Sequence, residues 1–391
     1  MPSLEAFLAS KPLFYAEIDY ERMPRAWKSI QSYFKLPKII HLVGTNGKGS
    51  TGRFLAHYLY RSGFSVGHYS SPHILKFNER IWLDGMDVSD VELALYHDKL
   101  YHHLSEEFRE SLSFFEYTTL LAIAVYEQCD YIVLEAGLGG EYDATAVFSN
   151  ILTLVTPIDI DHTDFLGDTI AKIAKTKLNA IQKAAILASQ KHQEVYDVAQ
   201  KYVLLKNIDI FRSEQFFTLE ELQKIEDFLI TKDLPLFLRE NLALALAAVK
   251  FLGFPIVIDY LKDITLFGRC QKIMSNVTID VGHNALAARA LLEHFKNKKI
   301  HLIFNTFSDK DYEKTLTILK PAIQVIEIIP ILNERIEKKE NLIKVIEKLD
   351  IPYRDFKKLE DSQEYLIFGS FSVVEAFLKH HAKTTKSEIS T

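Results

Sequence analysis

Short apolar runs of strand length alternate along this chain with longer stretches in which apolar residues recur at helical spacing. Such alternation is typical of a doubly wound α/β fold, a mostly parallel sheet covered by helices on both faces. The apolar runs and the helical stretches that form this pattern are 38–43, 65–69, 131–134 and 151–155, with 88–106 and 113–128. Because parallel strands end at one edge of a sheet, we expect the polar loops that follow them to converge there.

The pattern weakens between residues 184 and 260 and restarts near residue 266. From there it predicts strands alternating with helices, at Val277–Asp280, Asn284–His294, Ile300–Phe304, Asp311–Leu319 and Gln324–Ile329. A chain of 391 residues is also too long for one typical domain. We therefore expect two domains, a larger one at 1–266 and a smaller, Rossmann-like α/β domain at 267–391.

The composition is that of a globular protein, with 48% hydrophobic and 25% charged residues. A net charge of −6 argues against nucleic acid or an anionic membrane as the main partner. The two cysteines, Cys129 and Cys270, suit a reducing compartment. No apolar run reaches membrane length, and the start of the chain, with Glu5, lacks the pattern of a signal peptide. We expect a cytoplasmic protein that acts on small molecules.

The stretch after the first apolar run has the features of a phosphate loop. Glycines let backbone N–H groups approach phosphate oxygens, the following helix presents its N-terminal amides, and Lys48 adds a positive charge. Leu42 and Gly49 depart from the common form, which has a glycine and a hydroxyl at these positions. We still expect a P-loop ATPase-like first domain. Its expected cofactor-binding residues are Gly44, Thr45, Asn46, Gly47, Lys48, Gly49, Ser50 and Thr51.

Two loops after later strands contain candidate metal ligands. Glu135 ends an apolar strand, and a buried carboxylate beside a phosphate loop is a good Mg²⁺ ligand, although it can also simply mark the point where the strand leaves the core. His162 lies in the acidic loop 159–168 after another strand. Most such histidines only form local hydrogen bonds, and Mg²⁺ prefers oxygen ligands, so His162 needs independent support as a ligand.

Lys177 falls within the apolar stripe of an amphipathic helix predicted over Asp168–Lys183. Such a lysine usually extends its amine to the rim of the apolar surface. The alternative is a buried amine with a lowered pKa, which in its neutral form reacts with carbon dioxide to give a carbamate, an oxygen ligand for a metal. The pattern by itself favours the first interpretation.

A further candidate lies in the second domain, where Asp280-Val281-Gly282-His283-Asn284 joins a strand to a helix N-terminus. This position suits an anionic group or a ribose, with Asp280 accepting a hydrogen bond from a hydroxyl and His283 beside it. The alternative is structural, with Asn284 as a helix cap and His283 as a surface histidine. Glu116 and Tyr117, in an aromatic segment, are expected in the core.

An ordered series of motifs covers most of the chain. Its members are Gly44–Ser50, Ser71-Pro72-His73, Phe77–Ile81, Phe114–Tyr117, Leu134–Gly140, Asp143-Ala144-Thr145, Asp161-His162-Thr163, Asn241, Gly268-Arg269, Asp280–Asn284, Asp309-Lys310-Asp311 and Gly369-Ser370. Together they closely resemble the bacterial bifunctional dihydrofolate synthase/folylpolyglutamate synthase family, relatives of the Mur amino-acid ligases. The resemblance implies an ATP-dependent ligase that adds L-glutamate to dihydropteroate and to reduced folates through an acyl phosphate.

The resemblance also implies roles for individual residues. It implies two Mg²⁺ sites, one formed by Ser71 and Glu135 and the other by Glu135, His162 and Lys177, with Lys177 as a carbamate. It therefore reverses the interpretation of Lys177 that the pattern favours. Lys177 becomes a catalytic residue together with Lys48.

For the second domain, the resemblance implies a glutamate-ligase domain at 267–391 beside the ATP-binding domain at 1–266. Asn241, Arg269 and Asp280 match residues that hold the adenosine part of ATP. His283 matches a catalytic residue near the glutamate or phosphate site. The family resemblance further suggests a monomer.

Several positions depart from the family pattern and leave the exact substrate preference open. They include Glu141, Ala146, Thr176 and Gln271. One alternative is folylpolyglutamate synthase activity alone. A Mur-type ligase is another, although residues 1–37 leave no room for its usual N-terminal domain. From a different class, the chain is a phosphate-loop nucleotide-binding protein without ligase chemistry.

Overall fold

The computed structural model describes residues 1–12 and 19–389. The chain divides into two compact units, residues 1–228 with 238–264 and residues 229–237 with 265–391. Among the described helices, none combines the length and the apolar character needed to cross a bilayer. Both cysteines, Cys129 and Cys270, are free thiols.

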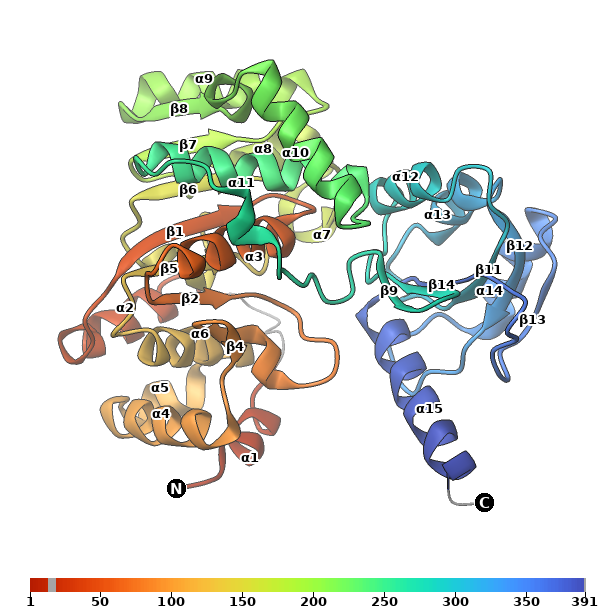
Figure 1. The fold of residues 1–391 in the computed structure, drawn as a ribbon. Coiled ribbons are helices and arrows are strands. Elements are labelled where there is room, and N and C mark those ends of the chain that lie inside the picture. The colour runs from red at the N-terminus through yellow and green to blue at the C-terminus, as the bar shows by residue number, and fades with distance from the viewer. Residues whose placement is uncertain (13–18, 390–391) are drawn as a thin grey trace. The chain divides into compact units, whose positions relative to one another are not determined.

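The first unit is built on an eight-stranded sheet with the strand order β4-β3-β2-β5-β1-β6-β7-β8 (Figure 1). The six strands β2-β5-β1-β6-β7-β8 are parallel to one another. At the edge beyond β2, β3 pairs antiparallel with β2 and β4 pairs antiparallel with β3. The bounds are β1 Lys38–Val43, β2 Val66–Tyr69, β3 Ile81–Leu83, β4 Met86–Asp87, β5 Tyr131–Glu135, β6 Leu152–Val155, β7 Ala184–Leu187 and β8 Asp209–Arg212. The loops that follow the parallel strands therefore lie at one edge of the sheet, as predicted.

Helices cover this sheet and bury its apolar side chains. Ile39 and Leu134 lie in one cluster with the apolar residues of α6, and Val43 and Val155 lie in another with those of α8 and α9. α3 packs against α11 and against β1, β2 and β5. The bounds are α1 Leu4–Ala9, α2 Arg22–Ile30, α3 Lys48–Arg61, α4 Asp90–His103, α5 Glu106–Ser111, α6 Phe114–Val125, α7 Thr163–Leu166, α8 Ile170–Leu178, α9 Gln193–Lys206, α10 Leu219–Thr231 and α11 Arg239–Phe251.

The second unit has its own six-stranded sheet, with the order β13-β12-β11-β14-β10-β9. All neighbouring strands are parallel except β9 and β10. The bounds are β9 Gln271–Met274, β10 Val277–Ile279, β11 Ile300–Phe304, β12 Ile323–Ile328, β13 Tyr353–Asp355 and β14 Tyr365–Phe368, with helices α12 Ala285–His294, α13 Tyr312–Leu319, α14 Lys339–Lys348 and α15 Phe371–Ile389. This confirms the α/β fold class of both parts.

One predicted element ends early. The helix expected over Asp168–Lys183 is α8, which begins at Ile170 and ends at Leu178. Asn179 caps it, and the backbone N–H groups of Ala180 and Ile181 donate to carbonyls three residues earlier, a tighter turn that ends the α-helix. The apolar character of Ile181, which is buried, extended the predicted helix too far.

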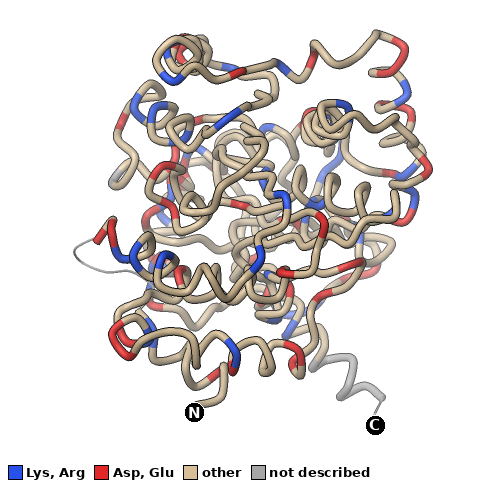
Figure 2. The backbone as a smooth tube through the Cα atoms, turned by 90° about the vertical axis from the view of Figure 1, so that its left-hand side faces the viewer, with Lys and Arg blue, Asp and Glu red and all other residues tan. Residues whose placement is uncertain are grey.

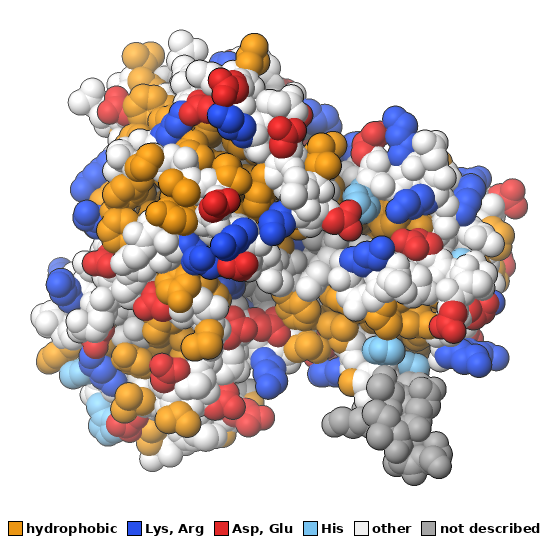
Figure 3. Space-filling model, viewed as in Figure 1, with side chains coloured by type: hydrophobic (Ala, Val, Ile, Leu, Met, Phe, Trp, Pro, Cys, Tyr) orange, Lys and Arg blue, Asp and Glu red, His pale blue; other side chains and the backbone are white. Residues whose placement is uncertain are grey.

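Charged residues of both signs are distributed along the backbone (Figure 2). On the face shown in Figure 3, acidic and basic side chains are interspersed rather than gathered by sign. A surface on which both signs are mixed does not create the strong field of one sign that steers a polyanion toward a protein.

Candidate active site

The phosphate loop, residues Gly44–Thr51, follows β1 and opens α3. Gly44 has φ +140° and a Cβ on it would lie 2.0 Å from Oγ1 of Thr156, so only glycine fits there. Gly47 is the N-cap of α3 with φ +88°, and none of the described side chains caps this helix. The N-terminal amides of α3 are therefore left for an anionic ligand, the arrangement that binds phosphate.

Thr45 ties the phosphate loop to the segment after β6. Its backbone N–H donates to the carbonyl of Pro157 at 3.0 Å. Its hydroxyl donates to the carbonyl of Asp159 and accepts from the N–H of the same residue, both at 3.1 Å. Nearby, Thr51 is fully buried and its Oγ1 has no hydrogen-bond partner among the residues that the structure describes. A buried polar atom that the protein leaves unsatisfied at a helix start is consistent with a ligand site.

Two lysines meet at one carbonyl of this loop. Nζ of Lys177 donates to the carbonyl of Gly44 at 2.8 Å, and Nζ of Lys48 lies 3.3 Å from the same oxygen. Lys177 is only 4% exposed, so the prediction that its amine reaches the rim of the apolar surface is wrong. Burial, followed by the charge of Lys48, lowers the pKa of the Lys177 amine to about 7.

Glu135 lies next to Lys48 in the same part of the site. It is the last residue of β5, is 5% exposed, and pairs in register with Leu42 of β1. Its Oε1 lies 3.9 Å from Nζ of Lys48, and its Oε2 accepts a hydrogen bond from the N–H of Ser71 at 3.3 Å. The structure thus brings Ser71, Glu135, Lys48 and Lys177 to one edge of the sheet. A buried carboxylate oxygen there suits the oxygen preference of Mg²⁺.

His162, another predicted metal ligand, lies in a more exposed position than Glu135 and Lys177. It precedes α7 with φ +49°, and its side chain is 41% exposed, with Nε2 3.7 Å from Oδ2 of Asp161. Within the described part of the chain, no group of three or more His, Cys, Asp or Glu side chains is arranged to hold a metal ion. The oxygen donors around Glu135 fit Mg²⁺ better than the nitrogen of His162.

Asn241 lies in the first turn of α11 and is 9% exposed. A Cβ on Gly47 would lie 2.3 Å from its Oδ1, which places the amide side chain directly against the phosphate loop. A long-range packing contact of this kind between α3 and α11 is invisible in the sequence, where the two residues are far apart.

In the second unit, Asp280 follows β10 and is 5% exposed. Its two carboxylate oxygens accept hydrogen bonds from the N–H groups of Gly282 at 2.7 Å and Cys270 at 2.8 Å. Burial raises the pKa of Asp280, and the nearby Arg269 opposes the shift. The guanidinium of Arg269 lies over the ring of Phe371, with its Cζ 5.3 Å from the centroid.

His283 and Asn284 end the same loop. Nδ1 of His283 lies 3.4 Å from the carbonyl of Val281. The side chain of Asn284 accepts a hydrogen bond from the N–H of Ala287 at 3.0 Å, so Asn284 caps α12, as its structural interpretation predicts.

Sequence reasoning missed two polar contacts near the first-unit loops. Arg22 forms a nearly buried ion pair with Glu116, whose N–O distance is 2.9 Å. Asp143, which the sequence marked only through the family motif, accepts the N–H of Leu138 at 2.9 Å and holds the glycine turn after Glu135. The sequence feature that could have indicated the Asp143 contact is its position shortly after the glycine turn, because an Asp after such a turn often accepts a hydrogen bond from a backbone N–H of the turn.

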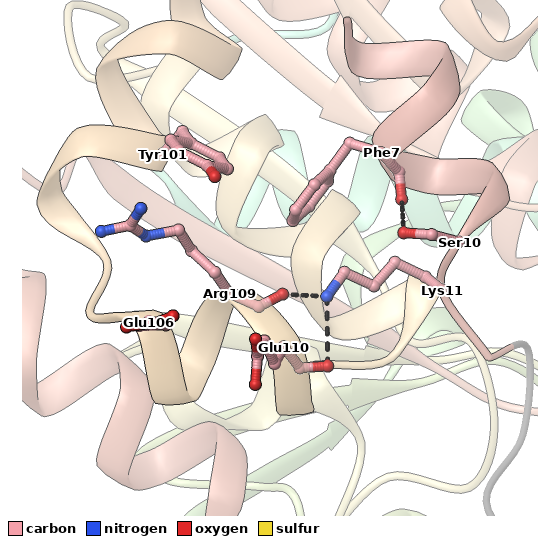
Figure 4. A pocket seen from close by; sticks show the side chains of 7 residues that line it. All are labelled: Phe7, Ser10, Lys11, Tyr101, Glu106, Arg109 and Glu110. Carbon is pink, nitrogen blue, oxygen red and sulfur yellow. Dashed lines mark hydrogen bonds between the residues drawn. The ribbon is translucent and has the colours of Figure 1, made fainter. Parts of the chain in front are cut away.

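A separate pocket of about 480 Å³ lies among α1, α4 and α5 (Figure 4). The residues that line it are Phe7, Ser10, Lys11, Tyr101, Glu106, Arg109 and Glu110, none of them predicted as a site residue. The Lys11 amine donates to the carbonyls of Arg109 and Glu110, the last turn of α5. Lys11 therefore acts as a helix C-terminal cap.

Comparison with known proteins identifies relatives of this chain in sequence and in structure. No model of a protein family matches the chain. The dihydrofolate synthase/folylpolyglutamate synthase of Escherichia coli (strain K12) is 31% identical over 376 residues, covering 86% of this chain and 85% of that protein. The crystal structure of Helicobacter pylori folylpolyglutamate synthetase is 38% identical with a TM-score of 0.80, covering 97% of this chain and 98% of that one.

A second solved structure, E. coli FolC in complex with DHPP and ADP, is 27% identical with a TM-score of 0.83, covering 98% of this chain and 99% of that chain. The two α/β units and the relatives that match nearly the whole chain together show an ATP-dependent ligase with a Mur ligase-like fold. Within that class, the chain belongs to the dihydrofolate synthase/folylpolyglutamate synthase family.

Proposed function

We propose that this chain, an ATP-dependent ligase by its family, joins L-glutamate both to dihydropteroate and to reduced folates. The observation that carries the proposal is the group in which Lys48 and Lys177 meet at the carbonyl of Gly44 and Lys48 lies beside Glu135. E. coli FolC, a relative by structure, is described with DHPP and ADP. We propose that this chain binds the same two classes of ligand, a nucleotide at the phosphate loop and a folate precursor that accepts the glutamate.

The reaction depends on the positioning of the substrates and on neutralisation of the phosphate charge more than on a protein nucleophile. A carboxylate of the folate substrate attacks the γ-phosphorus of ATP, giving an acyl phosphate and ADP. The glutamate amine then forms the amide bond, and phosphate leaves with the oxygen of the former carboxylate. Lys48 and the N-terminal amides of α3 stabilise the negative charge on the transferring phosphoryl group.

We propose that Ser71 and Glu135 hold one Mg²⁺ and that Glu135, His162 and Lys177 hold a second. When bound, Mg²⁺ supplies charge neutralisation to the phosphate oxygens. Glu135 supports this assignment best, because it is a buried oxygen donor next to the phosphate loop. His162 is supported by the family motif alone.

Lys177 is proposed to act as a carbamate. Its neutral amine attacks carbon dioxide, an N–C bond forms, and one proton passes to solvent, which leaves an anionic oxygen ligand. The deep burial of Lys177 supports this proposal, because desolvation favours the neutral amine that the reaction needs. The hydrogen bond to the Gly44 carbonyl orients the same nitrogen, which keeps one N–H after carbamylation.

For the remaining residues, we propose that Asn241, Arg269 and Asp280 hold the adenosine part of ATP and that His283 acts near the glutamate or phosphate site. We also propose an ATP-binding domain at 1–266 and a glutamate-ligase domain at 267–391. The protein is proposed to work as a cytoplasmic monomer without a nucleic-acid or membrane partner. Its net charge of −6 supports the last point.

The test is product analysis by mass spectrometry. Purified protein is incubated with Mg-ATP and L-glutamate, plus either dihydropteroate or tetrahydrofolate. We expect glutamate addition to both substrates, with strong loss in Lys177→Ala. The matched control is Lys175→Ala on the same helix, because Lys175 is exposed and its loss is expected to leave the products unchanged.

Each other outcome selects an alternative. Addition to tetrahydrofolate alone indicates a folylpolyglutamate synthase. Consumption of a cell-wall nucleotide precursor instead of folates indicates a Mur-type ligase. Nucleotide binding without product from any acceptor overturns the ligase proposal and favours a nucleotide-binding protein.

A further inference from the structure

A chain of buried hydrogen bonds runs from β1 to the glycine turn after β5. His41, fully buried on β1, has its Nε2 2.8 Å from Oγ1 of Thr145. Oγ1 of Thr145 lies 2.5 Å from Oδ1 of Asp143. The other carboxylate oxygen of Asp143 accepts the N–H of Leu138 at 2.9 Å. Four residues from three separate segments thus form one continuous path.

The donors and acceptors along this path fix the direction of each hydrogen bond. Asp143 accepts from two backbone N–H groups, those of Leu138 and Thr145, so it acts as an acceptor throughout. The Thr145 hydroxyl therefore donates to Asp143 and accepts from His41. That requires a proton on Nε2 of His41. Its Nδ1, which is buried and has no hydrogen-bond partner within the described part of the chain, is then the unprotonated nitrogen.

The path ends where the active-site group begins. Leu138 belongs to the turn 137–140, three residues after Glu135. A Cβ on Gly140 would lie 2.8 Å from Cα of Lys177, so the turn packs tightly against α8 at that lysine. The N–H of Glu141 also donates to the carbonyl of Thr176 at 3.0 Å. The turn therefore links the end of β5, which carries Glu135, to the helix turn that carries Lys177.

We propose that His41 is a positioning residue, which acts through Thr145 and Asp143 to hold the glycine turn and so sets Glu135 and Lys177 against the phosphate loop. In this role His41 acts through its hydrogen bond to Thr145. The part of the inference that concerns metal use rests on the proposed function of Glu135. The part that concerns the turn does not.

The test compares variants that break the path with variants that keep it. Thr145→Val removes the hydroxyl at nearly constant shape, and Thr145→Ser keeps it. His41→Leu removes the donor, and His41→Gln replaces it with an amide N–H. Thr315→Val is the matched control, because Thr315 is a buried threonine in α13 of the second unit whose hydroxyl donates to the carbonyl of Asp311, the N-cap of the same helix.

Two quantities are measured for each variant. The first is hydrogen–deuterium exchange of the segment 136–141 in the ligand-free protein. The second is the Mg²⁺ concentration that gives half-maximal ATP consumption with substrate and glutamate present. We expect both to rise at least about tenfold in Thr145→Val and His41→Leu, the loss typical of a buried hydrogen bond to a charged group. We expect both to stay within about twofold in Thr145→Ser, His41→Gln and Thr315→Val.

The possible failures are distinguishable. Unchanged exchange in Thr145→Val and His41→Leu overturns the proposal, because the path then does not hold the turn. Faster exchange with an unchanged Mg²⁺ requirement supports the hold on the turn and overturns the part of the proposal that concerns metal use. An inactive wild-type protein instead contradicts the proposed function, and the exchange measurement still decides whether the path holds the turn.

Discussion

The junction between β1 and α3 in the first unit and the junction between β10 and α12 in the second both lead from a buried strand through glycine and polar residues into a helix. In the first, Gly47 occupies the N-cap position and no side chain in the described part of the chain caps α3. In the second, Asn284 caps α12 with its own side chain. The cap by Asn284 accepts the backbone N–H of Ala287, so at least one helix amide of the second junction is already occupied within the protein.

The charged residues of the two junctions differ in the same way. In the first unit, Lys48 and Lys177 share one backbone carbonyl, and Lys48 lies 3.9 Å from the carboxylate of Glu135. In the second unit, both oxygens of Asp280 bond backbone N–H groups of its own loop. The comparison teaches that an uncapped helix start leaves its backbone N–H groups open to an anionic ligand, whereas a side-chain cap already occupies one of them.

The largest effect is expected from the first junction. Lys48→Met should lower the rate of amide-bond formation about a thousandfold, because it removes a cation from the transferring phosphoryl group. Thermal unfolding should change little. The assay is product formation with Mg-ATP, with Lys175→Met as the exposed-lysine control. A loss below tenfold would contradict the role of this junction in phosphate binding.

The buried strand before the first junction should make stability depend on pH. Burial lowers the pKa of His41 to about 4. The unfolded chain, with a pKa near 6.5, then takes up a proton that the folded state resists, so stability is lost as the pH falls from about 6.5 to about 4. Between pH 7 and pH 5 we expect His41→Gln to lose about 2 kcal/mol less than wild type. Urea unfolding at the two pH values checks this, and parallel curves for both proteins would refute it.

At the second junction, the carboxylate of Asp280 should matter for folding as well as for any ligand. Asp280→Asn turns an amide N–H toward a backbone N–H, so we expect a loss of roughly 2 kcal/mol in the stability of the second unit. Hydrogen exchange of the segment 277–283 under native conditions measures it. Unchanged exchange together with weaker ATP binding would instead indicate that Asp280 serves the ligand alone.

The smallest effect should come from the cap itself. Asn284→Ala removes the side-chain acceptor at the start of α12 and should cost about 1 kcal/mol of stability. Asn284→Ser should recover most of that loss, because serine also caps well. Denaturant unfolding of the three proteins provides the comparison. If the alanine variant is as stable as wild type, the two helix starts do not differ in the way described.

The strands and helices were largely predictable, because their apolar patterns are local. The phosphate loop was predictable for the same reason, since its glycines, Lys48 and the hydroxyl residues lie within a few positions of one another. Helix α8 shows the limit of this reasoning, because buried Ile181 continued the apolar pattern beyond Leu178, where the α-helix ends. The resemblance to a ligase family rested on motif order and is supported by the relatives.

The sequence by itself determined most of the strands and helices and the phosphate loop, because each depends on neighbouring residues, and it indicated the family through the order of its motifs. Only the tertiary structure decided that Lys177 is buried and bonded to Gly44, 133 residues away in the chain. It alone joined His41 to Asp143 through Thr145. The physical reason is that burial and hydrogen-bond partners depend on which strands and helices pack together, and a residue's own neighbours in the sequence do not specify those contacts.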